Sequence, residues 1–122
     1  MCRDGAKGIA GCCAMILHCV FCVFRNTVAD KDQKQILRDL SAFCETFEGV
    51  IDFEYGPNRD FEQKSQAFQA GFVIRFTDRA ALEAYAVHPT HQRLGERLSD
   101  LCEGGGDGII VFDIESDLSQ QQ

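Results

Sequence analysis

The chain has 122 residues, of which 45% are hydrophobic and 25% are charged, and its formal net charge is -7. This length fits one domain with a sizeable core. Because binding to phosphate groups needs a basic surface, the acidic balance argues against nucleic acid or an anionic membrane as a partner.

Residues 1–14 are predicted to form a flexible extension before a domain that spans residues 15–115. Residues 9–12 resemble a lipoprotein cleavage box, but the segment before them carries three charged residues in place of the apolar core of a signal peptide. No stretch reaches the ~20 apolar residues of a membrane-spanning helix. Met15 directly precedes the first periodic segment and is a candidate start site.

The seven cysteines are an odd number, and several lie in apolar runs, where cysteine behaves as a small hydrophobic residue. This usage predicts a reducing compartment and hence a cytoplasmic location. Cys19 and Cys22 have the spacing of a metal or redox pair. In the strand predicted there, however, residues three apart point to opposite faces, which favours a packing role.

The first two predicted elements are a strand over residues 16–24 and an amphipathic helix. The strand is rich in β-branched and aromatic residues and is apolar on both faces, so both faces should be covered. Asp30 or Asp32 is expected to cap the helix, and Gly49 to end it. The apolar residues at helical spacing are Ile36, Leu37, Leu40, Phe43, Cys44 and Phe47.

Two further strands are predicted over residues 50–55 and 66–76, joined by a polar loop over residues 56–65. The first alternates Ile51, Phe53 and Tyr55 with acidic residues. The apolar face of the second consists of Phe68, Ala70, Phe72, Ile74 and Phe76.

Thr77 and Asp78 are predicted to cap a short helix that contains Tyr85. Pro89 suits the first turn of the next helix, because its φ is fixed and it lacks an N–H group, and this places His88 at the cap. That helix carries Leu94, Leu98, Leu101 and Cys102. A glycine-rich turn over 103–108, a last strand over 109–114 and a loose tail over 116–122 follow.

His91 is the strongest candidate for chemistry. It lies in the first turn after Pro89, where unpaired N–H groups and the helix dipole favour the neutral ring and lower its pKa. It precedes Leu94 by three residues and Leu98 by seven, so it should face inward. A neutral histidine at physiological pH can accept a proton.

The strand and helix order βαββαβ predicts an α+β, ferredoxin-like antiparallel sheet with its helices on one face. The other face would be uncovered, although the first strand is apolar on both sides. We therefore expect a second copy of the chain to bury that face in a homodimer.

Several motifs follow one another in a recognisable order. They are His18 in the first strand, the Gly56 turn, residues 71–78 (GFVIRFTD), residues 81–85 (ALEAY), residues 88–91 (HPTH) and residues 111–113 (VFD). Together they resemble the stress-responsive A/B barrel (Dabb) family over roughly residues 15–115.

The resemblance implies a dimeric α/β barrel. Members include plant proteins that accumulate under stress and a polyketide cyclase of the olivetolic acid cyclase type, which performs an aldol-type cyclisation without metal or cofactor. Carried over, His91 would be the general base, Tyr85 the hydrogen-bond donor to a carbonyl or enolate, and His18 a residue that orients the substrate. The chain carries Leu40 and Ala70 where the cyclase has a tyrosine and a histidine.

We predict that a small apolar or phenolic carbonyl ligand binds near His91, in a pocket lined by His88, Leu37, Leu40, Phe72 and Leu94. The sequence is compatible with three functional hypotheses: a small-molecule binding barrel with acid-base (cyclase- or isomerase-like) chemistry, a non-catalytic stress-linked dimer, and a cofactor-free monooxygenase-like enzyme. In the second, His91 and Tyr85 are structural residues. A metal site made by His18, His88 and His91 is disfavoured, because a capping His88 need not point the same way as His91.

Overall fold

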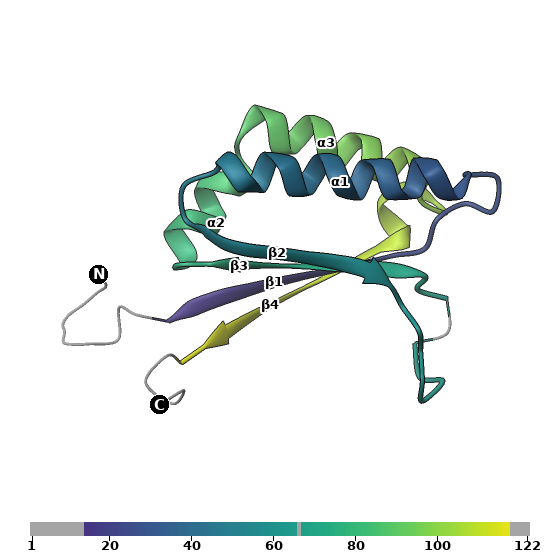
Figure 1. Ribbon diagram of the computed structural model, residues 1–122, viewed down its shortest axis with the longest axis horizontal. Helices are drawn as coiled ribbons and strands as arrows, with labels where there is room; N and C mark the ends of the chain where they lie inside the picture. The colour runs from purple at the N-terminus through teal and green to yellow at the C-terminus, as the bar shows by residue number, and fades with distance from the viewer. Residues whose placement is uncertain (1–13, 66, 118–122) are drawn as a thin grey trace.

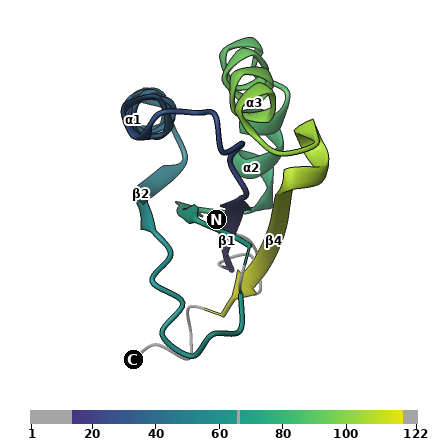
Figure 2. The same cartoon turned by 90° about the vertical axis from the view of Figure 1, so that its right-hand side faces the viewer.

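The computed structural model describes residues 14–65 and 67–117. Four antiparallel strands form one sheet in the order β2-β3-β1-β4, and the helices cover one of its faces (Figures 1 and 2). The elements are β1 (Met15–Cys22), α1 (Asp30–Thr46), β2 (Val50–Pro57), β3 (Ala70–Phe76), α2 (Arg79–Ala86), α3 (Pro89–Leu101), the 3-10 helix η2 (Gly105–Gly108) and β4 (Ile109–Ser116). The predicted α+β, ferredoxin-like fold is confirmed.

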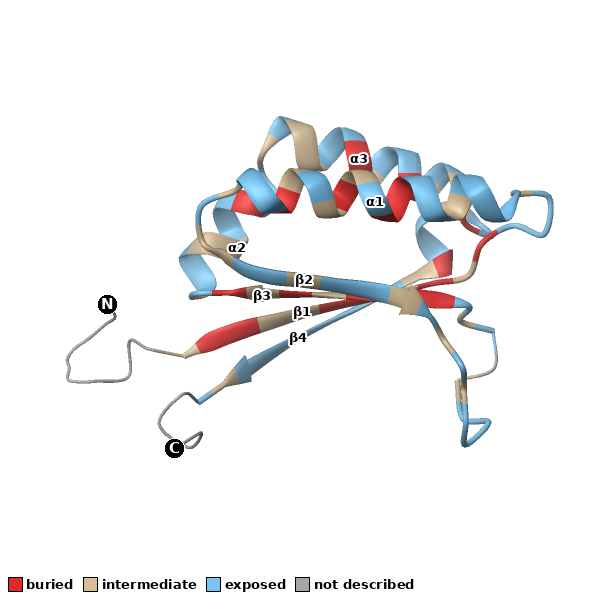
Figure 3. Ribbon diagram, viewed as in Figure 1, coloured by how far each residue is buried: buried red, intermediate tan, exposed pale blue. Residues whose placement is uncertain are grey.

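The core lies between the sheet and the helices. The register of β1 with β3 places His18 opposite Ile74 and Val20 opposite Phe72, so these four side chains share the face that the helices cover. Figure 3 shows the buried residues gathered on β1, β3 and the inner sides of the helices. The apolar side chains that α1 and α3 bury against this face are Ile36, Leu37, Leu40, Cys44, Leu94 and Leu98.

The opposite face of the sheet, called the open face below, is apolar and carries no helix. Leu17 and Phe21 of β1 point to this side, opposite Ile114 and Ile110 of β4. Phe112 lies between these two β4 residues on the same face, and half of its surface is exposed (50%). Within the described residues, the chain therefore leaves an apolar sheet face in water.

The two cysteines with metal or redox spacing lie on different faces of the sheet. Cys19 is opposite Phe112 on the open face, and Cys22 is opposite Ala70 on the helix-covered face. The prediction that these thiols point apart is confirmed.

The predicted strand ends needed correction. β1 ends at Cys22, because the next residues leave β4 and pair with the end of α3, where Phe24 forms a bridge with Cys102. β3 begins at Ala70, so Phe68 belongs to the preceding loop. β4 continues to Ser116. Most of the predicted extension and tail, residues 1–13 and 118–122, lies outside the described residues.

A bulge in β2 breaks the simple alternation predicted there. The register shifts between Val50 and Asp52, so that Val50 lies opposite Phe76 and Phe53 lies opposite Ile74. Ile51 is the additional residue and is 49% exposed. The prediction that Ile51 shares a face with Phe53 is therefore wrong.

Two of the three predicted N-cap assignments are confirmed. Asp78 Oδ1 accepts a hydrogen bond from Ala81 N at 2.9 Å, as predicted. His88 caps α3, also as predicted. Ala29 is the N-cap of α1 and forms no side-chain cap, so the prediction of Asp30 or Asp32 is wrong: both lie in the first turn, where their charges still favour the helix dipole. The helix ends before Gly49.

The paired glycines Gly71 and Gly56 offer a test of how closely β1 and β3 pack. A Cβ on Gly71 would lie 2.5 Å from Phe21 Cδ1 and 2.9 Å from the Val20 carbonyl oxygen, whereas a Cβ on Gly56 meets nothing within 4 Å. We expect Gly71→Ala to lower the free energy of unfolding by about 1–3 kcal/mol, because backbone must move. Gly56→Ala should change it by less than about 1 kcal/mol. The two variants are compared by urea unfolding at one protein concentration. Equal losses of stability would contradict the close approach of Gly71 to β1.

Candidate functional site

The three predicted catalytic side chains meet between the sheet and the helices. Tyr85, near the end of α2, lies with its ring centroid 4.2 Å from that of His91 in the first turn of α3. His18 of β1 lies 6.2 Å from Tyr85, with the two rings edge to face. Residues separated by up to 73 positions in the sequence (18 to 91) thus form one cluster.

Tyr85 is almost completely buried (1% exposed) in an aromatic environment that includes Phe43 and Phe76. Burial, followed by the neighbouring Cys44, raises the pKa of the Tyr85 phenol far above its ordinary value. Cys44 is the hydrogen-bonding neighbour of the phenol, and burial raises its own pKa to about 11. Tyr85 therefore keeps its proton and can act as a hydrogen-bond donor.

His91 is held in one tautomer. Its Nδ1 lies 3.2 Å from the carbonyl oxygen of Ala86, which can only accept, so Nδ1 carries the hydrogen and Nε2 has the free lone pair. Burial is the largest effect and lowers the pKa of His91; the hydrogen bond to Ala86 opposes it, and the nearby His18 and His88 each lower the pKa by less. The ring is therefore neutral near pH 7 and can accept a proton at Nε2.

His18 is oriented by a carboxylate that sequence reasoning did not single out as a site residue. Its Nδ1 lies 2.6 Å from Oδ1 of Asp113, which is directly opposite on β4. Since an ionised carboxylate only accepts, Nδ1 carries the hydrogen here as well. The His18 side chain is mostly buried and that of Asp113 is half exposed, so Asp113 connects the cluster to the solvent. In the sequence, Asp113 appeared only as part of the 111–113 motif in the last predicted strand, without a role in the site.

His88 has a different role from the other two histidines. Its Nδ1 accepts a hydrogen bond from Thr90 N at 3.1 Å, and its ring packs 4.9 Å from that of Phe43. The predicted cap is confirmed, and the lone pair of Nδ1 is engaged there. Between residues 14 and 117, Gln66 excepted, no three His, Cys, Asp or Glu side chains gather closely enough to hold a metal.

The predicted pocket-lining residues Leu37, Leu40, Phe72 and Leu94 belong to the packed core. None of these four residues lines the open cavity of about 330 Å³ that lies between α1 and the bulged start of β2. Its lining residues are Ser41, Cys44, Glu45, Val50, Ile51, Asp52 and Phe53. Cys44, which lines this cavity, is also a neighbour of the Tyr85 phenol. The sequence predicted Cys44 only as an apolar residue of the helix and gave no sign of the cavity, since a bulge next to a helix leaves no simple pattern.

The family model of the stress responsive A/B barrel domain (Dabb) matches residues 16–116. The chain belongs to this family. A solved dimeric ferredoxin-like protein of unknown function from Jannaschia sp. CCS1 is 44% identical; the match covers 83% of this chain and 98% of that one, with a TM-score of 0.78. A Dabb family protein from Mesorhizobium loti is 24% identical over 83% of this chain and 95% of its own, with a TM-score of 0.67.

The hydroxynitrile lyase from Passiflora edulis is 15% identical and has a TM-score of 0.74, with 85% of this chain and 94% of the lyase covered. At such identity the similarity shows the fold alone, and the same holds for the Mesorhizobium protein. A comparison with curated protein sequences found no match. Among the described residues, no helix combines the length and apolar character needed to cross a membrane.

The lowered pKa of His91 predicts a specific pH dependence of stability. Because the unfolded ring takes up its proton near pH 6.5 and the folded ring only at lower pH, the stability present above pH 6.5 decreases as the pH falls below it, until the folded ring is protonated. As the pH falls below 6.5, we expect the free energy of unfolding to decrease less for His91→Gln than for the wild type, as measured by urea unfolding. Parallel curves for the two proteins would show that the His91 pKa is not lowered.

Proposed function

We propose that this A/B barrel protein binds a small carbonyl or phenolic ligand beside Tyr85 and His91 and performs acid-base chemistry on it without metal or cofactor. One observation carries the proposal: His91, whose Nδ1 faces the Ala86 carbonyl oxygen, lies in ring contact with Tyr85, and His18 with its Asp113 partner lies beside them. A base and a hydrogen-bond donor in one buried cluster are the groups that proton abstraction next to a carbonyl needs.

In the proposed reaction, Nε2 of His91 takes a proton from the carbon next to the ligand carbonyl. The electron pair of the broken C–H bond forms the C=C bond of an enolate, and the charge that develops on the carbonyl oxygen accepts a hydrogen bond from Tyr85. His91 later returns the proton. Burial and the nearby His18 make the charged His91 ring costly, so His91 holds the proton only until it returns it.

The cavity between α1 and β2 supports a route for the ligand to Tyr85 past Cys44. Its volume of about 330 Å³ is at the lower end of the range for small-molecule sites. Glu45 and Asp52 line it, which favours neutral ligands over carboxylates.

The competing function is a non-catalytic dimer in which the cluster is part of the architecture. The near-complete burial of Tyr85 favours it, because a phenol that is 1% exposed reaches a ligand only if its neighbours move.

We also propose that the protein acts as a homodimer in a reducing, cytoplasmic environment. The apolar open face supports the dimer, as does the relative from Jannaschia, which is described as dimeric. Buried free thiols at Cys19, Cys22, Cys44 and Cys102 support the reducing environment.

A ligand screen by thermal shift tests the proposed site. A β-dicarbonyl or phenolic compound at ~100 times its Kd should stabilise the wild type by about 2.7 kcal/mol. We expect His91→Ala and Tyr85→Phe to lose most of this shift, because each removes a group that contacts the ligand. The exposed Arg79→Gln, on the outer side of α2, is the control and should keep the shift. A shift that survives in both site variants places the ligand elsewhere and refutes the proposal.

The dimer is tested by placing a charge on the open face. Phe112→Asp should make the protein monomeric at micromolar concentration, because burying an unpaired carboxylate in an apolar interface is costly. Val87→Asp, at an apolar position that is 69% exposed and lies between α2 and α3, should remain dimeric. Sedimentation equilibrium measures both, and a dimeric Phe112→Asp protein would exclude this face as the interface.

A further inference from the structure

Residues 58–65 of the loop between β2 and β3 are held in a defined shape by their own side chains. Oδ1 of Asp60 accepts hydrogen bonds from the backbone N of Lys64 and Ser65, each at 2.9 Å, and from Ser65 Oγ at 2.6 Å. Asn58 donates to Ser65 Oγ and to the Phe68 carbonyl oxygen, at 2.7 and 2.8 Å. Both ends of the loop are thereby tied together, so the turn between them has a fixed position.

This ordered turn presents an apolar ring to water. Asp60 and Gln63 flank it with φ angles of 48° and 59°, in the left-handed region that non-glycine residues rarely adopt. Between them, Phe61 is 90% exposed. A phenylalanine loses its favourable burial in such a position, and ordered, exposed aromatic residues mark contact sites in protein interfaces.

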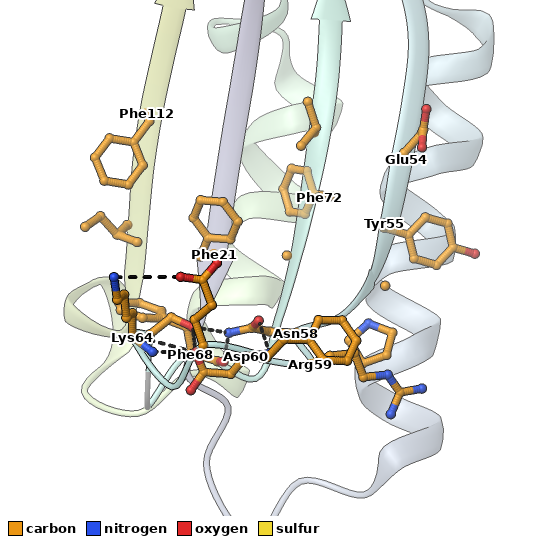
Figure 4. Close-up of a pocket in the computed structure, with 18 residues that line it drawn as sticks. Phe21, Glu54, Tyr55, Asn58, Arg59, Asp60, Lys64, Phe68, Phe72 and Phe112 are labelled. Atoms are coloured by element: carbon orange, nitrogen blue, oxygen red, sulfur yellow. Dashed lines mark hydrogen bonds and ion pairs between the residues drawn. The ribbon is translucent and has the colours of Figure 1, made fainter.

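The loop projects from the sheet on the side away from the helices, as Figures 1 and 2 both show. Together with the open face it borders a cavity of about 920 Å³. Phe21 and Phe112 line this cavity from the strands, and Phe68 lines it from the loop (Figure 4). Phe61 of the loop is also a lining residue. The loop and the apolar sheet are therefore one continuous surface, and a molecule that covers the sheet also meets the loop.

We propose that the β2–β3 loop is an arm that grips a second copy of the chain, with Phe61 buried against the partner's open face. The inference rests on the proposed dimer and names the segment that secures it. A second copy fits best because the surface is self-complementary: each copy offers a protruding aromatic ring and an aromatic cavity. The rim also carries charges of both signs, Arg59 and Lys64 beside Glu54 and Glu62, so opposite charges can pair between two identical surfaces.

The chain contains no tryptophan, so Phe61→Trp introduces a single fluorescent reporter at the tip of the arm. We expect its emission to be shifted to shorter wavelength in the dimer and to move to longer wavelength on dilution, as the indole enters water. Val87→Trp, on the helix side of the molecule, is the matched control and should emit at the same wavelength at every concentration.

Phe61→Ser gives the energetic test in the same sedimentation experiment. We expect it to weaken the dimer on the order of tenfold or more without changing the Tm of the monomer, because the side chain contacts little within its own copy.

If the wild type is a dimer but the reporter stays exposed and Phe61→Ser associates normally, the arm is refuted and the dimer stands. If the wild type is a monomer, the arm and the proposed dimer fail together. A reporter that becomes buried on addition of a small phenol to the monomer would also overturn the arm and assign the cavity to a ligand.

Discussion

The packing of Tyr85 is the contact on which the rest of the structure depends. Its ring packs against aromatic side chains from both layers: Phe43 of α1, Phe47 at the C-cap of that helix, Phe76 of β3, His18 of β1 and His91 of α3. The position of Tyr85 thus fixes how α2 and α3 sit on the sheet, and it places both histidines against one phenol. The architecture of this end of the core and the chemistry of the candidate site are therefore the same set of contacts.

Successive side chains of β1 point to opposite faces of the sheet, and each face carries a different candidate function. One set of its side chains, which includes His18, points into the covered core, and the other, which includes Phe21, points to the open face. The candidate chemistry lies on the first side and the candidate interface on the second. β4 contributes to both faces: its Asp113 binds His18 on the covered face, and its Phe112 lies on the open face. A second copy on the open face would hold β4, and with it Asp113, in place.

Local signals made the elements, their order and two helix caps predictable. Asp78 and His88 each precede a helix by one residue, so that capping needed no knowledge of the tertiary structure. The partner of His18 could not be predicted in this way, since Asp113 is 95 residues distant and meets it only through the strand order. The bulge at Ile51 and the bond between Tyr85 and Cys44 likewise depend on how separate elements pack.

The resemblance to the A/B barrel family named three candidate site residues, and the hydrogen-bond partners in the structure indicate where their ring protons lie. His91 and His88 are only three positions apart, yet their Nδ1 atoms do opposite things: one donates to a carbonyl oxygen and the other accepts from a backbone N–H. This difference separates the candidate base from the helix cap.

The most direct measurement is therefore a long-range proton–nitrogen NMR spectrum of the three histidine rings near pH 7.5, assigned with single His→Gln variants. The account predicts that His91 carries its hydrogen on Nδ1 and has a bare Nε2, and that His88 shows the reverse tautomer. A His91 ring with its hydrogen on Nε2, or one that is protonated at this pH, would contradict it, because the cluster would then contain no base positioned to accept a proton.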